Sequence, residues 1–176
     1  MAEGMISGWT DPVPQDQVDP ARINKEWLAY HESGHAVACY FLLIKFDCVS
    51  IEPGPSYLAG VLGMKPADGD REKRDRMLAL YAGRAVEKYR TGGKWDHTGA
   101  GPDLEQAHRI ACDLCNGEGS RASALEGQME KAATRFVEEH RSEIESLAPV
   151  LEREKCLPWR KVKDAIRAAR KVGPEK

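Results

Sequence analysis

Apolar residues recur at helical spacing along most of the chain, and this pattern predicts a mostly α-helical fold. The first helix is predicted from Asp19-Pro20 to about Lys45, because Asp is a favourable N-cap and proline suits the first helical position. Its second half contains a continuous apolar run over residues 36–44, which predicts a largely buried helix. This run is far shorter than the roughly 20 residues that cross a bilayer, so we expect no membrane segment.

Two short strands are predicted after this helix. Residues 48–52 alternate apolar and polar side chains, and residues 57–63 form a second short run rich in apolar residues. The Pro53-Gly54-Pro55 segment between them is typical of a turn. We therefore expect a small β-sheet or hairpin beside the first helix.

Helical patterns resume in the rest of the chain, and they suggest a single domain. They predict helices over residues 71–89, from Pro102 to about Leu114, over 121–140 with a continuation to 151, and from 158 to about 169. Residues 1–19 are rich in Gly, Pro, Asp and Gln without periodicity, which indicates a flexible N-terminal arm. The expected organisation is this arm, one domain over residues 20–170 and a frayed tail over 171–176.

The first predicted helix contains an HExxH pentad, His31-Glu32-Ser33-Gly34-His35. Residues four apart lie on the same helical face, so His31 and His35 can bind one metal ion. The pattern is typical of zinc hydrolases, in which the glutamate, here Glu32, acts as general base. Because buried histidines need polar partners, a shared Zn²⁺ explains the pair better than two satisfied core histidines do.

The pentad supplies only two ligands, whereas a catalytic zinc takes three from the protein and keeps one position open. The longer HExxHxxGxxH motif is excluded, because Ala38 and Phe41 occupy its Gly and His positions. Taken alone, the residues leave several candidates for the third ligand. These are Glu72 and Glu87 on the second predicted helix, and Asp96, His97 and Asp103 in or just after the loop that precedes the third.

Composition and charge exclude several other functions. Among 176 residues, 26 are basic and 28 acidic, so the net charge of −2 gives no indication of nucleic-acid binding. No glycine-rich phosphate loop is present to bind ATP. The N-terminus lacks the basic and apolar regions of a signal peptide, and five scattered cysteines do not form a secreted disulfide framework. We therefore expect a cytoplasmic protein.

Cys112 and Cys115 form a CxxC motif. A redox pair, half of a structural zinc site and chance are the alternatives. No second cysteine pair completes a zinc site, and no thioredoxin-like strand-turn-helix pattern surrounds the motif. The sequence therefore assigns no function to it.

Four blocks of sequence carry a family resemblance. They are YHESGHAV at 30–37, VSI at 49–51, AGRAVE at 82–87 and TGAGPDL at 98–104, and a weaker block follows at 148–154. In order and separation, these blocks resemble the peptidase domain of the FtsH family of AAA-linked zinc proteases. The resemblance runs from about Trp27 to Ile166 and implies a helical zinc-peptidase domain.

The resemblance also implies roles for two acidic residues. Asp103 matches the aspartate of the family's TGAxxDL block, which implies that it is the third zinc ligand. The family places Glu87 near the zinc helix, where it could orient a ligand imidazole through the second ring nitrogen. Pro102 departs from the polar residue that is usual before the ligand aspartate.

Membrane-bound members of the family carry an AAA ATPase module and a transmembrane segment, and this sequence contains neither. ATP-driven unfolding is therefore not implied by the resemblance. A separate ATPase or a homo-oligomer stays open as a partner.

The predicted function is zinc-dependent, ATP-independent hydrolysis of peptide bonds in peptides or unfolded proteins. Glu32 would take a proton from a zinc-activated water and pass it to the leaving amine. An extended substrate could add to a strand formed by Ala59, Gly60, Val61 and Leu62. The alternative is a retired peptidase that keeps zinc and binds peptides or proteins without cleaving them. Glu32 favours the enzyme, because a structural zinc needs no general base.

Overall fold

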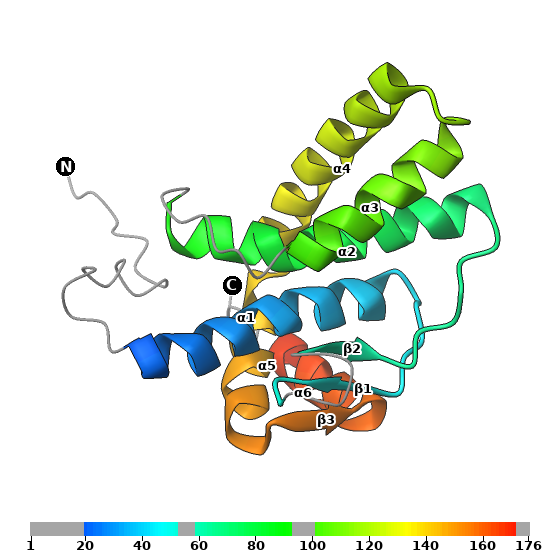
Figure 1. Cartoon of the computed structure of the whole chain (residues 1–176). Coiled ribbons are helices and arrows are strands. Elements are labelled where there is room, and N and C mark those ends of the chain that lie inside the picture. Colours follow the sequence, from blue (N-terminus) through cyan, green and yellow to red (C-terminus); the bar gives the residue numbers. More distant parts are fainter. Residues whose placement is uncertain (1–19, 53–58, 93–100, 172–176) are drawn as a thin grey trace, which may run out of the picture.

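The computed structural model describes residues 20–52, 59–92 and 101–171, and it confirms a mostly α-helical fold with a small antiparallel sheet (Figure 1). The elements are α1 (Pro20–Phe41), β1 (Cys48–Ser50), β2 (Gly60–Leu62), α2 (Asp70–Arg90), α3 (Gly101–Leu114), α4 (Gly119–Glu139), α5 (Arg141–Glu154), β3 (Cys156–Pro158) and α6 (Trp159–Lys171). The predicted arm over 1–19 lies outside the described residues. The predicted tail over 171–176 also lies outside them, except for Lys171, which is the last residue of α6.

The helix that carries the HExxH pentad begins at Pro20, as predicted, but it ends at Phe41 and not at Lys45. Leu43 turns the chain with a φ of 59°, and the amide of Ile44 donates a hydrogen bond to the carbonyl oxygen of Cys39 at 2.9 Å. This is a Schellman ending, in which a left-handed residue closes the last helical turn. The end of the apolar run is therefore a turn, and the predicted boundary was wrong.

The sheet has three strands in the order β2-β1-β3, with β1 antiparallel to both neighbours. Val49 in β1 lies opposite Val61 in β2 and opposite Leu157 in β3. The sequence predicted the first two strands and missed β3. The third strand ties the start of α6 to the centre of the sheet.

Helix α1 lies between two groups of elements (Figure 1). On one side it packs against α2, which in turn packs against α3 and α4. On the other side it contacts α5, α6 and the sheet. Leu147 and Leu151 of α5 are fully buried, and each such side chain contributes about 1.5–3 kcal/mol relative to exposure. The pentad is thus held on a helix that the core surrounds.

Two helices replace the single continuous pattern predicted from residue 121 to residue 151. α4 ends and α5 begins at His140, which is the C-cap of the first helix and the N-cap of the second. No helix in the described parts of the chain is long and apolar enough to span a membrane.

Candidate metal centre

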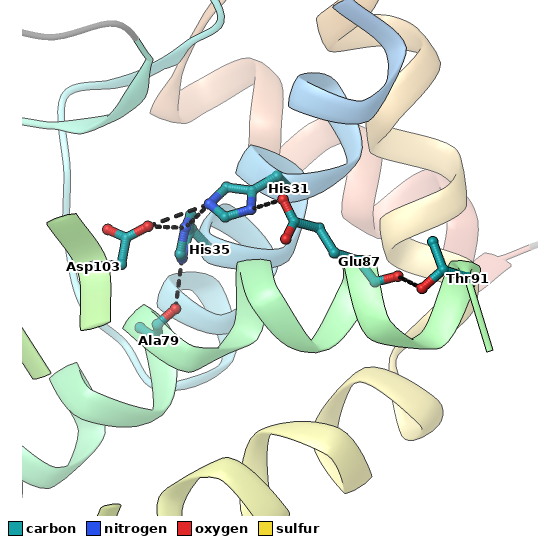
Figure 2. A network of polar contacts seen from close by, with 6 residues as sticks. All are labelled: His31, His35, Ala79, Glu87, Thr91 and Asp103. Atoms are coloured by element: carbon teal, nitrogen blue, oxygen red, sulfur yellow. Dashed lines mark hydrogen bonds and ion pairs between the residues drawn. The ribbon is translucent and has the colours of Figure 1, made fainter. Parts of the chain in front are cut away.

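The two histidines of the pentad lie side by side on α1, facing α2 and the first turn of α3 (Figure 2). His31 and His35 are only 4% and 7% exposed. Their rings meet edge to face, with centroids 4.6 Å apart. One helical turn therefore brings both imidazoles into a buried polar site.

The outer nitrogen of each ring is held by a hydrogen-bond acceptor on α2. Nδ1 of His31 lies 2.8 Å from Oε1 of Glu87, and Nδ1 of His35 lies 2.7 Å from the carbonyl oxygen of Ala79. Since a carboxylate and a carbonyl only accept, both Nδ1 atoms carry the donated hydrogen. In the neutral rings, both Nε2 atoms therefore keep a lone pair for the interior of the site.

Three electron-pair donors converge there. The two Nε2 atoms are 2.9 Å apart. Oδ2 of Asp103 lies 3.3 Å from Nε2 of His31 and 3.2 Å from Nε2 of His35. Such atoms repel one another unless they share a cation. Zinc bonds of about 2.0–2.1 Å in a tetrahedron place neighbouring ligand atoms about 3.3 Å apart. The donor set and its spacing fit Zn²⁺.

In the absence of a metal, these residues share a proton. Burial lowers the pKa of His31, but hydrogen bonds to Asp103 and Glu87 outweigh burial and raise it to about 10. Burial also lowers the pKa of His35, and the charge of Asp103 overcomes that effect and raises it. Burial raises the pKa of Asp103, but the two histidines hold it well below the usual range. A metal ion at this site would therefore compete with a proton.

Glu32, between the two histidines in sequence, is 4% exposed. A carboxylate oxygen of Glu32 lies within 4.8 Å of one ring nitrogen of each histidine. Its Oε2 is buried with no hydrogen-bond partner among the residues that the structure describes. Burial raises the pKa of this carboxyl group. A buried carboxylate with this oxygen free of described partners, beside the donor set, is suited to exchanging protons with a group bound there.

Gly83 allows α2 to pass close to the histidine rings. A Cβ at this position would lie 2.5 Å from Nε2 of His35 and 2.8 Å from Nε2 of His31. Gly34 serves the same close approach from α1, since a Cβ there would lie 2.9 Å from the carbonyl oxygen of Ala82. Neither role was predicted from the sequence. A glycine within a buried helical pattern was the available signal, because glycine otherwise weakens a helix.

The structure separates the candidates for the third ligand. Asp103 faces both Nε2 atoms, whereas Glu87 contacts His31 on the opposite ring nitrogen. Glu72 is exposed, and its Oε2 accepts a hydrogen bond from the backbone amide of Asp68. The other two candidates, Asp96 and His97, lie outside the described residues.

The segment predicted to bind substrate lies at the edge of the sheet. Gly60, Val61 and Leu62 form β2, Ala59 precedes it, and all four are partly buried. Within the described part of the chain, β2 pairs with β1 on one side only. The substrate role of this segment stays a prediction.

Comparison with known families gives one match. The model of Peptidase family M41 matches residues 20–120, which is more than half of the chain. The matched region contains α1, α2 and α3, and thus every residue of the donor set. No curated protein matches the chain.

Proposed function

Because this chain belongs to peptidase family M41 and has an FtsH-type peptidase domain, we propose that it is a zinc-dependent endopeptidase that cleaves peptides or unfolded proteins without ATP. One observation carries the proposal. The Nε2 atoms of His31 and His35 and Oδ2 of Asp103 converge within 3.3 Å of one another. Beside them lies Glu32, whose buried Oε2 has no hydrogen-bond partner among the described residues.

His31, His35 and Asp103 are the proposed zinc ligands. Glu87 supports them from outside, because its carboxylate fixes the orientation of the His31 ring and raises the basicity of Nε2. The Ala79 carbonyl does the same for His35. A zinc ion bound by these three groups supplies Lewis-acid polarisation of a peptide carbonyl and activation of water.

Glu32 is the proposed general base. Its carboxylate takes a proton from the attacking water and then delivers that proton to the nitrogen of the leaving amine. Burial raises the pKa of Glu32, which brings it nearer to neutral pH and makes the protonated form a usable acid. The surrounding core keeps the carboxylate in place for both transfers.

The open side of β2 is the proposed binding site for the substrate backbone. An extended peptide can add there as a further strand, with main-chain hydrogen bonds that do not depend on its sequence. Peptides and unfolded proteins supply extended segments with free main-chain groups for such pairing. This requirement supports peptides and unfolded proteins as the substrate class.

The test is turnover of a quenched fluorescent peptide and of casein by zinc-loaded protein without nucleotide. Glu32→Gln should lower kcat/KM by about 10²–10⁴-fold, because the general base is removed. Bound zinc should stay at the wild-type level. Glu72→Gln is the matched control, since it removes one exposed carboxylate away from the donor set and should leave turnover unchanged.

A chelator should abolish turnover, zinc should restore it, and added ATP should leave it unchanged. A zinc-loaded wild-type protein that cleaves neither substrate would overturn the proposal. That result would favour the alternative, a zinc-binding module that recognises peptides or proteins without cleaving them.

A further inference from the structure

A second group of reactive side chains lies on an exposed face of α3 and α4, outside the proposed metal centre. Sγ of Cys112 is 3.5 Å from Nε2 of His108, one turn earlier on α3. Nδ1 of His108 is 3.2 Å from Oε1 of Glu126 on α4. The imidazole thus bridges a thiol and a carboxylate through its two opposite nitrogens. The imidazole can therefore interact with the thiol and with the carboxylate at the same time.

The hydrogen bonds define what each group does. The carboxylate of Glu126 only accepts, so Nδ1 of His108 donates to it. In the neutral ring, Nε2 is then an acceptor, and the group that faces it is the thiol of Cys112. A nucleophile, a base and a carboxylate that orients the base are therefore arranged in the order that activated thiols require.

We propose that Cys112 is a nucleophilic thiol that reacts with small hydroperoxides, with His108 as its base and Glu126 as the residue that positions His108. The proposal does not rest on the zinc site. It assigns a role to one cysteine of the CxxC motif that the sequence left without a function.

The reaction consumes one thiol and one hydroperoxide. The thiol proton moves to Nε2 of His108, and the sulfur electron pair attacks the distal peroxide oxygen. The S–O bond forms as the O–O bond breaks, and the departing oxygen takes the proton from His108. The products are a cysteine sulfenic acid and an alcohol, or water when the reagent is hydrogen peroxide. Sulfur is oxidised and the peroxide is reduced.

The position of the thiol favours a small reagent over an acyl substrate. Cys112 lies inside α3, where the backbone amides are used in the helix's own hydrogen bonds, so they cannot form an oxyanion hole. The side chain of His108 is 58% exposed, which leaves the group open to solvent. A hydroperoxide needs only an accessible sulfur and a returning proton, and both are present.

Site-resolved oxidation tests the proposal, and the five free cysteines provide an internal reference. Full-length protein would be treated with hydrogen peroxide at neutral pH. Sulfenic acid would be trapped with dimedone, and the labelled peptides would be quantified by mass spectrometry. Cys156 is exposed, whereas Cys112 is only partly exposed. Because the thiol of Cys48 contacts that of Cys156 and would consume its sulfenic acid, the comparison uses a Cys48→Ser background. We expect Cys112 to be labelled faster than Cys156, although exposure alone predicts the reverse order.

Three variants separate activation from exposure. His108→Gln should slow labelling of Cys112 at least about tenfold. The effect should be smaller than the 10²–10⁴-fold typical of a general base in an enclosed site, because this site faces solvent. Glu126→Gln should slow it by a smaller factor. Glu138→Gln, which removes an exposed carboxylate from the same helix, should have no effect. Labelling of Cys156 should stay constant in all three.

Two results would overturn the proposal. One is faster labelling of Cys156 than of Cys112 in the wild-type protein. The other is an unchanged Cys112 rate in folded His108→Gln. Because His108 is largely exposed, circular dichroism should show wild-type folding for this variant, so a slower rate at Cys112 alone reports loss of the base.

Discussion

The proposed metal centre and the proposed thiol group use the same local construction, and they differ mainly in burial. Each has two side chains four residues apart on one helix, His31 and His35 in the first and His108 and Cys112 in the second. In each, a carboxylate from a neighbouring helix contacts Nδ1 of the first of these residues. Glu87 holds His31 at 2.8 Å, and Glu126 holds His108 at 3.2 Å. The exposed fraction of the histidine side chain is 6% in the first case and 58% in the second.

This difference shows how the environment selects the chemistry. In the buried pair, lone pairs cannot be solvated, so a shared cation is the most effective way to stabilise them. In the exposed pair, water can solvate both groups, so no shared cation is needed to stabilise them. The same helical spacing is therefore suited to metal binding in one place and to the proposed nucleophile in the other.

The largest expected effect is on zinc affinity, and it comes from adding a methyl group to the helix that packs against the buried pair. Gly83→Ala would place a Cβ 2.5 Å from Nε2 of His35, so zinc binding should weaken more than about 100-fold. Gly127→Ala on α4 is the matched control, because among the described residues no atom beyond the adjoining helical backbone lies within 4 Å of its added Cβ. It should stabilise the protein by about 0.5–1 kcal/mol through helix propensity. Zinc titration and urea unfolding measure the two effects, and equal zinc affinity in both variants would contradict the close approach.

Neutralising the outer carboxylate should have the next largest effect. Glu87→Gln keeps an acceptor near Nδ1 of His31 but removes the charge that makes the ring a better ligand. Zinc affinity should fall about 10–100-fold, the range typical of such supporting groups. Glu126→Gln, the equivalent change at the exposed pair, should leave zinc affinity unchanged. Competition with a chromophoric chelator measures both, and a loss of affinity in Glu126→Gln would argue against two independent groups.

Removing zinc should change how stability depends on pH. Burial lowers the pKa of His31, but its hydrogen bonds raise it from 6.5 to about 10 in the metal-free protein. Between these values the folded state holds a proton that the unfolded state has lost. The free energy of unfolding should therefore fall as pH rises, by up to about 1.4 kcal/mol per pH unit.

Zinc-bound imidazoles carry no proton on Nε2, so the zinc-loaded protein should show no such fall above pH 6.5. Urea unfolding at pH 7 and pH 9, with chelator and with zinc, compares the two forms. A chelated protein that is equally stable at both values would show that the buried proton is absent.

The smallest expected effect lies at the ends of the helices that carry the two pairs. Leu43 closes α1 with a φ of 59°, and Asn116 follows α3 with a φ of 51°. Leu43→Gly should stabilise the protein by about 0.5–1 kcal/mol, since a leucine is strained in this region. Asn116→Gly should change stability by only a few tenths of a kcal/mol, because asparagine tolerates the left-handed conformation. Urea unfolding tests both, and an equal gain would show that strain at Leu43 is not the cause.

Most of the helices could be predicted because apolar periodicity is a local property. The second helix was predicted over 71–89 and is observed over Asp70–Arg90. The end of α1 was mispredicted, because an apolar run reads the same in a buried helix and in the turn that follows it. β3 was missed for a different reason. Only Leu157 of its three residues is buried, and its pairing with Val49 joins segments far apart in the sequence.

The candidate site was only partly predictable. The i, i+4 spacing identifies His31 and His35, but it cannot show which acidic residue approaches them from another helix. Asp103 was chosen through a family resemblance, and the packing of α3 places it there. The same spacing joins His108 to Cys112, but the sequence does not show that α4 places Glu126 beside His108.

Zinc titration of metal-free protein tests the central claim most directly. The wild type should bind one zinc ion per chain, and Asp103→Asn should bind it at least about 100-fold more weakly, because a charged ligand is lost. Glu72→Gln should match the wild type. Equal affinity in the wild type and in Asp103→Asn would contradict the proposed ligand set, and so would the absence of zinc binding in the wild type.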